Sequence, residues 1–207
     1  HVLVMERIHG IPVDKVDKLK ELGYDMNEIG QKLAENFVKQ ILDDAFFHAD
    51  PHPGNIWIMD GKIAWLDFGM MGKLTGRDKE LFRSAVTAIV NNDIYQLKNV
   101  FLTLGTAKQP IDHALLYTDV DEMVSRYGNL ELGNMNLGVV FQEFMHVANK
   151  HHILLPQSVT MLGRGVMTIE GVLRFCAPDI NLLQILATHM SNEFFRNLDW
   201  NKELKRT

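Results

Sequence analysis

The sequence lacks several features that mark common classes of protein. Its single cysteine, Cys176, excludes an internal disulfide framework and is typical of a reducing compartment. There is no block of basic residues and the formal net charge is −5, so a nucleic-acid partner has no electrostatic support. The longest uncharged runs, such as 180–192, are shorter than the roughly 18 residues expected of a membrane span.

What remains is the composition of an ordinary globular domain. The 207 residues are 46% hydrophobic and 23% charged, which is enough to bury one sizeable core. No signal peptide is visible, and the first residue is His1 rather than methionine. We therefore expect the chain to be a piece of a longer protein.

Two motifs, FHADPHPGN and LDFG, carry the chemistry. In the first, Asp50 lies two residues after His48 and five residues before Asn55. The second is a DFG triplet that begins at Asp67, and a short β-hairpin fits between the motifs. This order and separation are typical of protein-kinase-type phosphoryl transfer, in which one Asp addresses the acceptor while the Asn and the DFG Asp hold magnesium.

The chemistry explains these residue types. Magnesium prefers oxygen ligands and keeps several waters, so Asn55 and Asp67 suffice to hold it with ATP. Asp50 is then free to orient or deprotonate the acceptor, and a positioned base gives about 10²–10⁴-fold in rate. Two prolines and Gly54 indicate a rigid loop that presents side chains. A surface turn with incidental acids is the alternative.

The other residues of the motifs are assigned supporting roles. His48 is grouped with Asp50 as catalytic, although bracing of the loop backbone is the favoured interpretation. His52 lies where a protein kinase usually has its catalytic-loop lysine. The remaining loop-supporting residues are Gly54, Phe68 and Gly69. The alternating His48, Asp50 and His52 could also ligate a transition metal, but that interpretation explains neither Asn55 nor the DFG triplet.

An apolar, β-favouring segment, 1–8, precedes a glycine and a proline and is predicted to be a strand. Its Met-Glu-Arg-Ile run resembles a kinase hinge. In that interpretation Met5 lines an adenine pocket, and backbone groups near Glu6 and Ile8 bind the adenine edge. A plain edge strand is the alternative.

A long helix leads into the first motif and a hairpin follows it. Asn27 is predicted to cap the helix, and one apolar face is formed by Ile29, Leu33, Phe37, Ile41 and Ala45. The hairpin consists of 56–59 and 62–66 around Asp60-Gly61, and it returns the chain to the DFG triplet. A shorter helix is expected within 13–22.

After the DFG triplet the chain departs from a protein kinase. Residues 70–74 are expected to be a brief loop before Thr75, an N-cap with Asp78 in the capping-box position. No Ala-Pro-Glu triplet occurs, so peptide phosphorylation is disfavoured. Amphipathic helices are predicted at 76–90, 94–104, 113–127, 137–150, 157–175 and 180–197.

Several other polar or aromatic groups have no assigned chemistry. His151 and His152 are interpreted as a solvated helix end without an acidic companion. A pocket and a salt-bridge ladder both remain open for Arg164, Glu170 and Arg174. The tail 200–207 is expected to fray. Its aromatic residues and those just before it could pack on the domain, which is favoured, or lie on a membrane surface. These residues are Phe194, Phe195 and Trp200, together with the aliphatic Leu198.

FFHADPHPGNI followed by LDFGMMG resembles the UbiB-type atypical kinases, a family associated with ubiquinone biosynthesis. The resemblance extends to Leu155-Pro156 and to EGVLR before Pro178-Asp179. It implies that Asp50 is the catalytic-loop Asp and that Asn55 and Asp67 are the magnesium ligands.

The resemblance covers the C-terminal lobe only, with no N-terminal nucleotide lobe. It implies the following fold: mainly α with a small β-hairpin, divided into a hinge-like strand (1–12), the catalytic loop and DFG region (24–72) and a family-specific helical subdomain (75–198). A nucleotide site normally closes between two lobes. We therefore expect residues 1–207 alone to bind Mg-ATP weakly and to turn over little.

The implied function is that of an ATP- and magnesium-dependent kinase or ATPase that supports quinone-lipid synthesis. Its target would be a quinone-precursor lipid or another small molecule rather than a protein. Its location would be the cytoplasm or an organelle matrix, peripheral to a membrane. Two alternatives remain: an aminoglycoside- or choline-kinase-like phosphotransferase, and a non-catalytic nucleotide-sensing scaffold.

Overall fold

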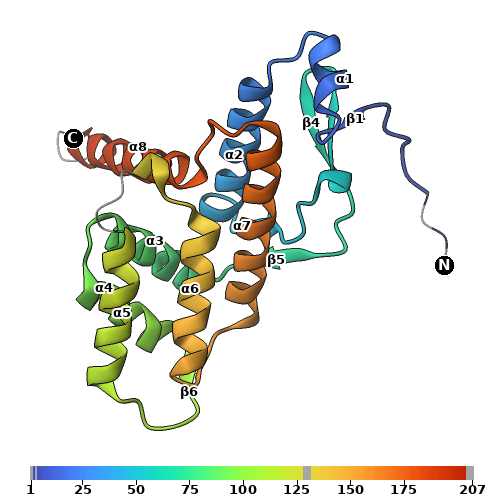
Figure 1. Cartoon of the computed structure of the whole chain (residues 1–207). Coiled ribbons are helices and arrows are strands. Elements are labelled where there is room, and N and C mark those ends of the chain that lie inside the picture. The colour runs from blue at the N-terminus through green and yellow to red at the C-terminus, as the bar shows by residue number, and fades with distance from the viewer. Residues whose placement is uncertain (1, 3, 128–131, 204–207) are drawn as a thin grey trace.

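The computed structural model describes residues 2, 4–127 and 132–203, with the backbone alone for 132 and 193–203. Within these residues the chain is mainly helical, with three small antiparallel sheets (Figure 1). Figure 1 shows the hairpin and the N-terminal segment on one side of α2 and α7, and the later helices on the other. The predicted fold class is confirmed.

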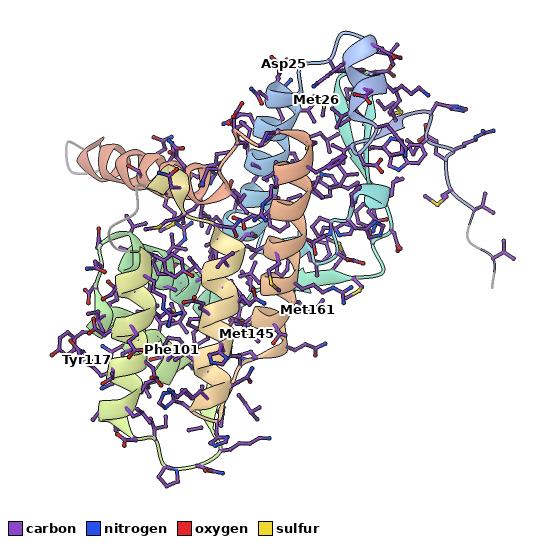
Figure 2. The ribbon with its side chains drawn as sticks, in the orientation of Figure 1. Asp25, Met26, Phe101, Tyr117, Met145 and Met161 are labelled. Atoms are coloured by element: carbon purple, nitrogen blue, oxygen red, sulfur yellow. The ribbon has the colours of Figure 1, made fainter. Side chains whose placement is uncertain are left out.

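The first helices are α1 (Val16–Glu21) and α2 (Met26–Leu42). Asp25 begins α2, and its Oδ1 accepts hydrogen bonds from the backbone N–H of Asn27 at 2.8 Å and of Glu28 at 3.4 Å (Figure 2). The predicted cap, Asn27, was therefore wrong by two residues. Both residue types favour N-caps, and the sequence alone did not choose between them.

The predicted apolar face of α2 is buried against the core. Four of its residues are buried: Ile29, Leu33, Phe37 and Ile41. Ala45 does not continue the face, because the helix ends at Leu42. The chain turns there, with Ala45 at a positive φ of 51°.

A three-stranded sheet has the order β1 (Ile11–Pro12), β3 (Ile56–Met59) and β4 (Lys62–Trp65). The predicted β3–β4 hairpin is confirmed. Asp60 and Gly61 have φ values of 50° and 73°, the pair of positive values that a tight two-residue turn requires.

The strand predicted over 1–8 was wrong. The described residues of that segment have no regular secondary structure, and the only strand before α1 is the short β1. Val2 and Val4 are 91% and 89% exposed. A β-favouring segment forms no strand without an edge to pair with, and this one has no such edge within the described residues.

Strand β2 (Phe46–His48) pairs with β5 (Met71–Lys73), which occupies most of the segment predicted to be a loop. Gly72 lies opposite Phe47, and a Cβ atom at Gly72 would collide with that buried ring. The two strands therefore approach closely, and they connect the first motif to the segment after the DFG triplet.

The remaining helices follow the predicted bounds closely. Thr75 and Asp78 form the predicted capping box at the first of them. A short pair of strands was not predicted. It joins the segment between α4 and α5 to the segment between α6 and α7, and it consists of β6 (Thr106–Ala107) and β7 (Ile153–Leu154). The helices are α3 (Gly76–Val90), α4 (Ile94–Leu104), α5 (His113–Tyr127), α6 (Leu137–Lys150), α7 (Gln157–Cys176) and α8 (Leu182–Glu203).

Packing between helices forms the core. Helices α6 and α7 lie side by side, and α7 also lies along α2 (Figure 1). Phe101 of α4, labelled in Figure 2, stacks on Phe144 of α6 with ring centroids 4.1 Å apart. Cys176 is buried as predicted, and burial raises the pKa of its thiol to about 11.

No described helix is both long and apolar enough to cross a membrane. The tail aromatics singled out in the sequence have side chains outside the described residues, as does the end of the chain from 204. Part of the predicted linker, residues 128–131, also lies outside them.

The interpretation of His151 and His152 as a solvated helix end was wrong for His151, whereas His152 is exposed just after α6. The His151 side chain is 5% exposed, and its Nε2 lies 2.7 Å from Oδ2 of Asp119. Lys150 also donates to Asp119 at 2.8 Å. The acidic partner comes from α5, too far away in sequence for local spacing to reveal it.

Asp119→Asn is expected to destabilise the fold by about 1–3 kcal/mol at pH 7, because it weakens a partly buried, charge-assisted contact. Burial works to raise the pKa of Asp119, but hydrogen bonds from Lys150 and His151 outweigh it and hold that pKa below the ordinary 3.8. A lowered pKa contributes stability above the unfolded pKa and loses it as the pH falls through the folded pKa. The difference from wild type should therefore shrink below about pH 4.

Urea unfolding at a series of pH values measures this difference. Asp121→Asn is the matched control on the same helix, because the side chain of Asp121 has one hydrogen bond among the described residues, accepted from Ser125 at 3.4 Å. That change should cost less than about 0.5 kcal/mol. A deficit for Asp119→Asn that stays constant down to pH 3 would contradict the assignment.

Candidate functional site

Backbone hydrogen bonds bring the two motifs to one place. Ala49 N–H donates to Met70 O at 2.9 Å, and Leu66 N–H donates to Asn55 O at 2.9 Å. The first contact continues the β2–β5 pairing, and the second continues the β3–β4 hairpin. The loop that contains Asp50 and Asn55 is therefore hydrogen-bonded at both of its ends to the segment that contains Asp67.

Asn55 ends a short 3₁₀ turn and is 6% exposed. Its Nδ2 donates to the backbone carbonyl of Asp50 at 3.2 Å, which fixes the amide plane. Within the described residues its Oδ1 has no hydrogen bond. The amide oxygen is therefore the group left to meet a cation.

Asp67 has a left-handed backbone, with φ of 55°. Asp is one of the few residues that adopt this region readily, and such conformations cluster at functional sites. Its Oδ1 accepts from Gly69 N–H at 3.2 Å, and no described residue donates to Oδ2. One carboxylate oxygen is thus oriented by the DFG turn, and the other is left for a ligand.

These donors fit the ion that the sequence predicts. Asn55 and Asp67 together offer an amide oxygen and a carboxylate oxygen, the hard ligands that Mg²⁺ takes while it keeps several waters. Held by these two residues, such an ion would supply positive charge against the phosphates of a nucleotide.

His48 is 1% exposed, and every polar atom of its ring is engaged. Its Nδ1 accepts from Asp50 N–H at 3.2 Å, which leaves Nε2 to donate to Leu66 O at 2.9 Å. Gln40 of α2 accepts from the His48 backbone N–H at 2.9 Å. These contacts favour the bracing role of His48 over a direct part in proton transfer.

The predicted supporting residues lie close to His48 and its hydrogen bonds. His52 Nδ1 accepts from Gly54 N–H at 3.1 Å and so closes the turn around Pro53. Phe68 is 63% exposed, and the centroid of its ring lies 6.1 Å from that of His48.

No cluster of three or more His, Cys, Asp or Glu side chains in the described part of the chain could hold a metal ion. That finding disfavours the transition-metal interpretation of the loop.

The predicted adenine contacts are not brought to the loop. Met5 is 65% exposed, Glu6 is also exposed, and Ile8 is half-buried. No hydrogen bond or ion pair between described residues joins this segment to residues 48–69. The predicted nucleotide contacts therefore stay a prediction.

The site has one side chain whose role the sequence left open. Arg164 of α7 places Nη2 3.5 Å from Oδ1 of Asp50. Next to it, a Cβ atom at Gly165 would lie 3.1 Å from the carbonyl oxygen of His48. No local spacing could have revealed this contact, because the residues are brought together only by the packing of α7.

Glu170, the second of the undecided residues, has a structural role. It is 8% exposed and accepts from the backbone N–H groups of Leu137 and Gly138, both at 2.7 Å. Burial raises the pKa of Glu170, although these two hydrogen bonds oppose the change. It caps α6, and no ion pair within the described residues links it to Arg164 or Arg174.

Fold and site together define a protein-kinase-like C-terminal lobe with additional helices. Residues 1–101 match the family described as the ABC1 atypical kinase-like domain, and residues 120–181 match the UbiB helical domain. The chain belongs to this UbiB-type family of atypical kinase-like proteins, as its motifs predicted.

Relatives come from bacteria and plants. The chain is 33% identical over 207 residues to an uncharacterized protein in the hydrogenase 1 5′ region of Clostridium pasteurianum, covering 98% of this chain and 39% of that protein. It is 30% identical to the probable protein kinase UbiB of Shewanella woodyi, covering 88% and 34%. It is also 30% identical to the chloroplastic protein ACTIVITY OF BC1 COMPLEX KINASE 1 of Arabidopsis thaliana, covering 89% and 27%. The chain thus spans about two fifths or less of the length of these relatives.

Proposed function

We propose that this chain carries the catalytic loop and metal site of an ATP- and magnesium-dependent atypical kinase or ATPase. The observation that supports this most strongly is the connected set of contacts around Asp50, Asn55 and Asp67. The Asn55 amide is bound to the Asp50 backbone, and the Asn55 backbone is bound to the residue before Asp67. A core histidine orders both loops.

In this proposal each residue has one task. Asn55 and Asp67 hold Mg²⁺ against the phosphates of ATP. Asp50 accepts a hydrogen bond from the acceptor hydroxyl and orients it for attack. His48 keeps the loop in position, and the nucleotide base meets the segment that contains Met5, Glu6 and Ile8.

We propose a lipid or other small molecule as the acceptor, in support of quinone-lipid synthesis. The segment after the DFG triplet is β5, which leads within a few residues to α3, so the described chain offers no long segment for docking a peptide there. The family resemblance supports this pathway, whereas the name of the Shewanella relative, probable protein kinase UbiB, specifies no lipid. Location at a membrane surface, in the cytoplasm or an organelle matrix, belongs to the same proposal.

We also propose a role for each of three regions of the chain. Residues 1–12 would form the connection to a nucleotide lobe, 24–72 the catalytic loop and DFG region, and 75–198 the acceptor side. The exposure of Met5 is consistent with a segment that a nucleotide lobe would cover.

ADP release by the full natural protein tests the proposal. Turnover should require Mg²⁺, should stop with excess EDTA and return when Mg²⁺ is restored, and should rise when a quinone-precursor lipid is added. Stimulation by choline or an aminoglycoside instead of the lipid would favour the alternative phosphotransferase. Nucleotide binding without Mg²⁺-dependent turnover would favour a non-catalytic role.

A further inference from the structure

The contact between Arg164 and Asp50 joins the helical subdomain to the catalytic loop. The Arg164 side chain is 54% exposed, and Asp50 is 26% exposed. At 3.5 Å the pair is an ion pair of moderate length, and Asp50 is the only polar partner of the guanidinium among the described residues. An exposed pair of this kind contributes little to stability, so stability alone does not explain it.

The backbone under Arg164 is fixed, although its side chain is not. Leu162 and Val166 are 1% and 0% exposed, and Gly165 packs against the backbone of the loop. The α-carbon of residue 164 is thus held at a set place beside Asp50. A change of partner by the guanidinium would therefore need movement of the exposed side chain alone and not of the helix.

The catalytic loop itself contributes no permanently charged cation. The segment FHADPHPGN contains no lysine or arginine, and His52, at the position of the usual kinase lysine, has its Nδ1 engaged by Gly54. A phosphoryl group in transfer carries charge on three oxygens, and an arginine fork matches that geometry. Arg164 is a cation that the fold places 3.5 Å from Asp50, the residue that would orient the acceptor.

We propose that Arg164 leaves Asp50 when substrates bind and pairs with the phosphoryl group during transfer. This inference rests on the proposed function. The bond between the γ-phosphorus and the bridging oxygen breaks, and ADP departs with its electrons. A new bond forms to the acceptor oxygen, the acceptor proton passes to Asp50, and Arg164 balances the charge on the oxygens in flight.

Binding of Mg-ADP with and without aluminium fluoride tests the inference by calorimetry on the full natural protein. The planar fluoride mimics the phosphoryl group in transfer. Wild type should bind the fluoride complex about ten- to a hundred-fold more tightly than Mg-ADP alone. Arg164→Ala should lose most of that increase and keep its affinity for Mg-ADP, and Arg164→Lys should retain part of it, because it keeps the charge without the fork.

Arg126→Ala is the matched control. Arg126 is a helical arginine, 62% exposed, whose Nη1 contacts a single carboxylate, Glu143, at 3.1 Å. It should behave as wild type, and an unchanged urea midpoint for each variant confirms that the fold is intact.

The outcomes separate this inference from the function. If wild type shows the increase and Arg164→Ala shows it equally, the inference is overturned and the proposed function stands. The inference is also overturned if Arg164→Ala weakens Mg-ADP and the fluoride complex by the same factor, since that indicates a role limited to positioning the loop. If wild type binds neither, both fall.

Discussion

Asp67→Asn is expected to lower Mg-dependent ADP release by about 10²–10³-fold, the cost of removing one preorganised charge-stabilising group. Asparagine tolerates the left-handed backbone of this position, so the DFG turn should keep its shape. The change removes the negative charge but retains an oxygen. The Mg²⁺ concentration needed for half-maximal activity should therefore rise, and added Mg²⁺ should recover part of the loss.

Asp60→Asn is the control for this change. Asp60 lies in the hairpin turn with nearly the same φ, 50° against 55° for Asp67, and it is exposed. Its replacement tests the backbone effect without touching the predicted metal site, and activity should be unchanged. Equal activity of the Asp67 and Asp60 variants would remove the basis for the metal assignment.

Most of the secondary structure could be predicted from local sequence patterns. The hairpin followed from Asp60-Gly61, the capping box from Thr75 and Asp78, and the later helices from apolar periodicity, because each depends on residues close in sequence. The same holds for the grouping of the two motifs, since a short hairpin connects them. The 1–8 strand failed because strand formation depends on a pairing edge, which the segment's own composition does not reveal.

The contacts that the sequence did not reveal are those made between distant helices. Arg164 reaches Asp50, and His151 reaches Asp119, only after several helices have packed. Spacing rules apply within one element, so they gave His151 no acidic partner and left the role of Arg164 open. The site is thus predictable where it is built from one hairpin and unpredictable where α7 completes it.

Helix α7 packs closely through two glycines, Gly163 against α6 and Gly165 against the loop at His48. Replacement of Gly163 is expected to have the larger steric effect. A Cβ atom there would overlap the ring of Phe141 on α6, which is 8% exposed. Gly163→Ala should therefore force α6 and α7 apart or displace the ring, at a cost of about 1–3 kcal/mol. Thermal unfolding should show a fall of about 2–4 °C for each kcal/mol.

Gly171→Ala, on the same helix, gives the opposite expectation. A Cβ atom at Gly171 meets nothing within 4 Å, so this variant should gain up to about 1 kcal/mol from helix propensity alone. The sign of the change thus separates packing from propensity within one helix. If Gly163→Ala were as stable as Gly171→Ala, the Phe141 ring would have to move freely. The rigid placement of α7, on which the role of Arg164 depends, would then lose its support.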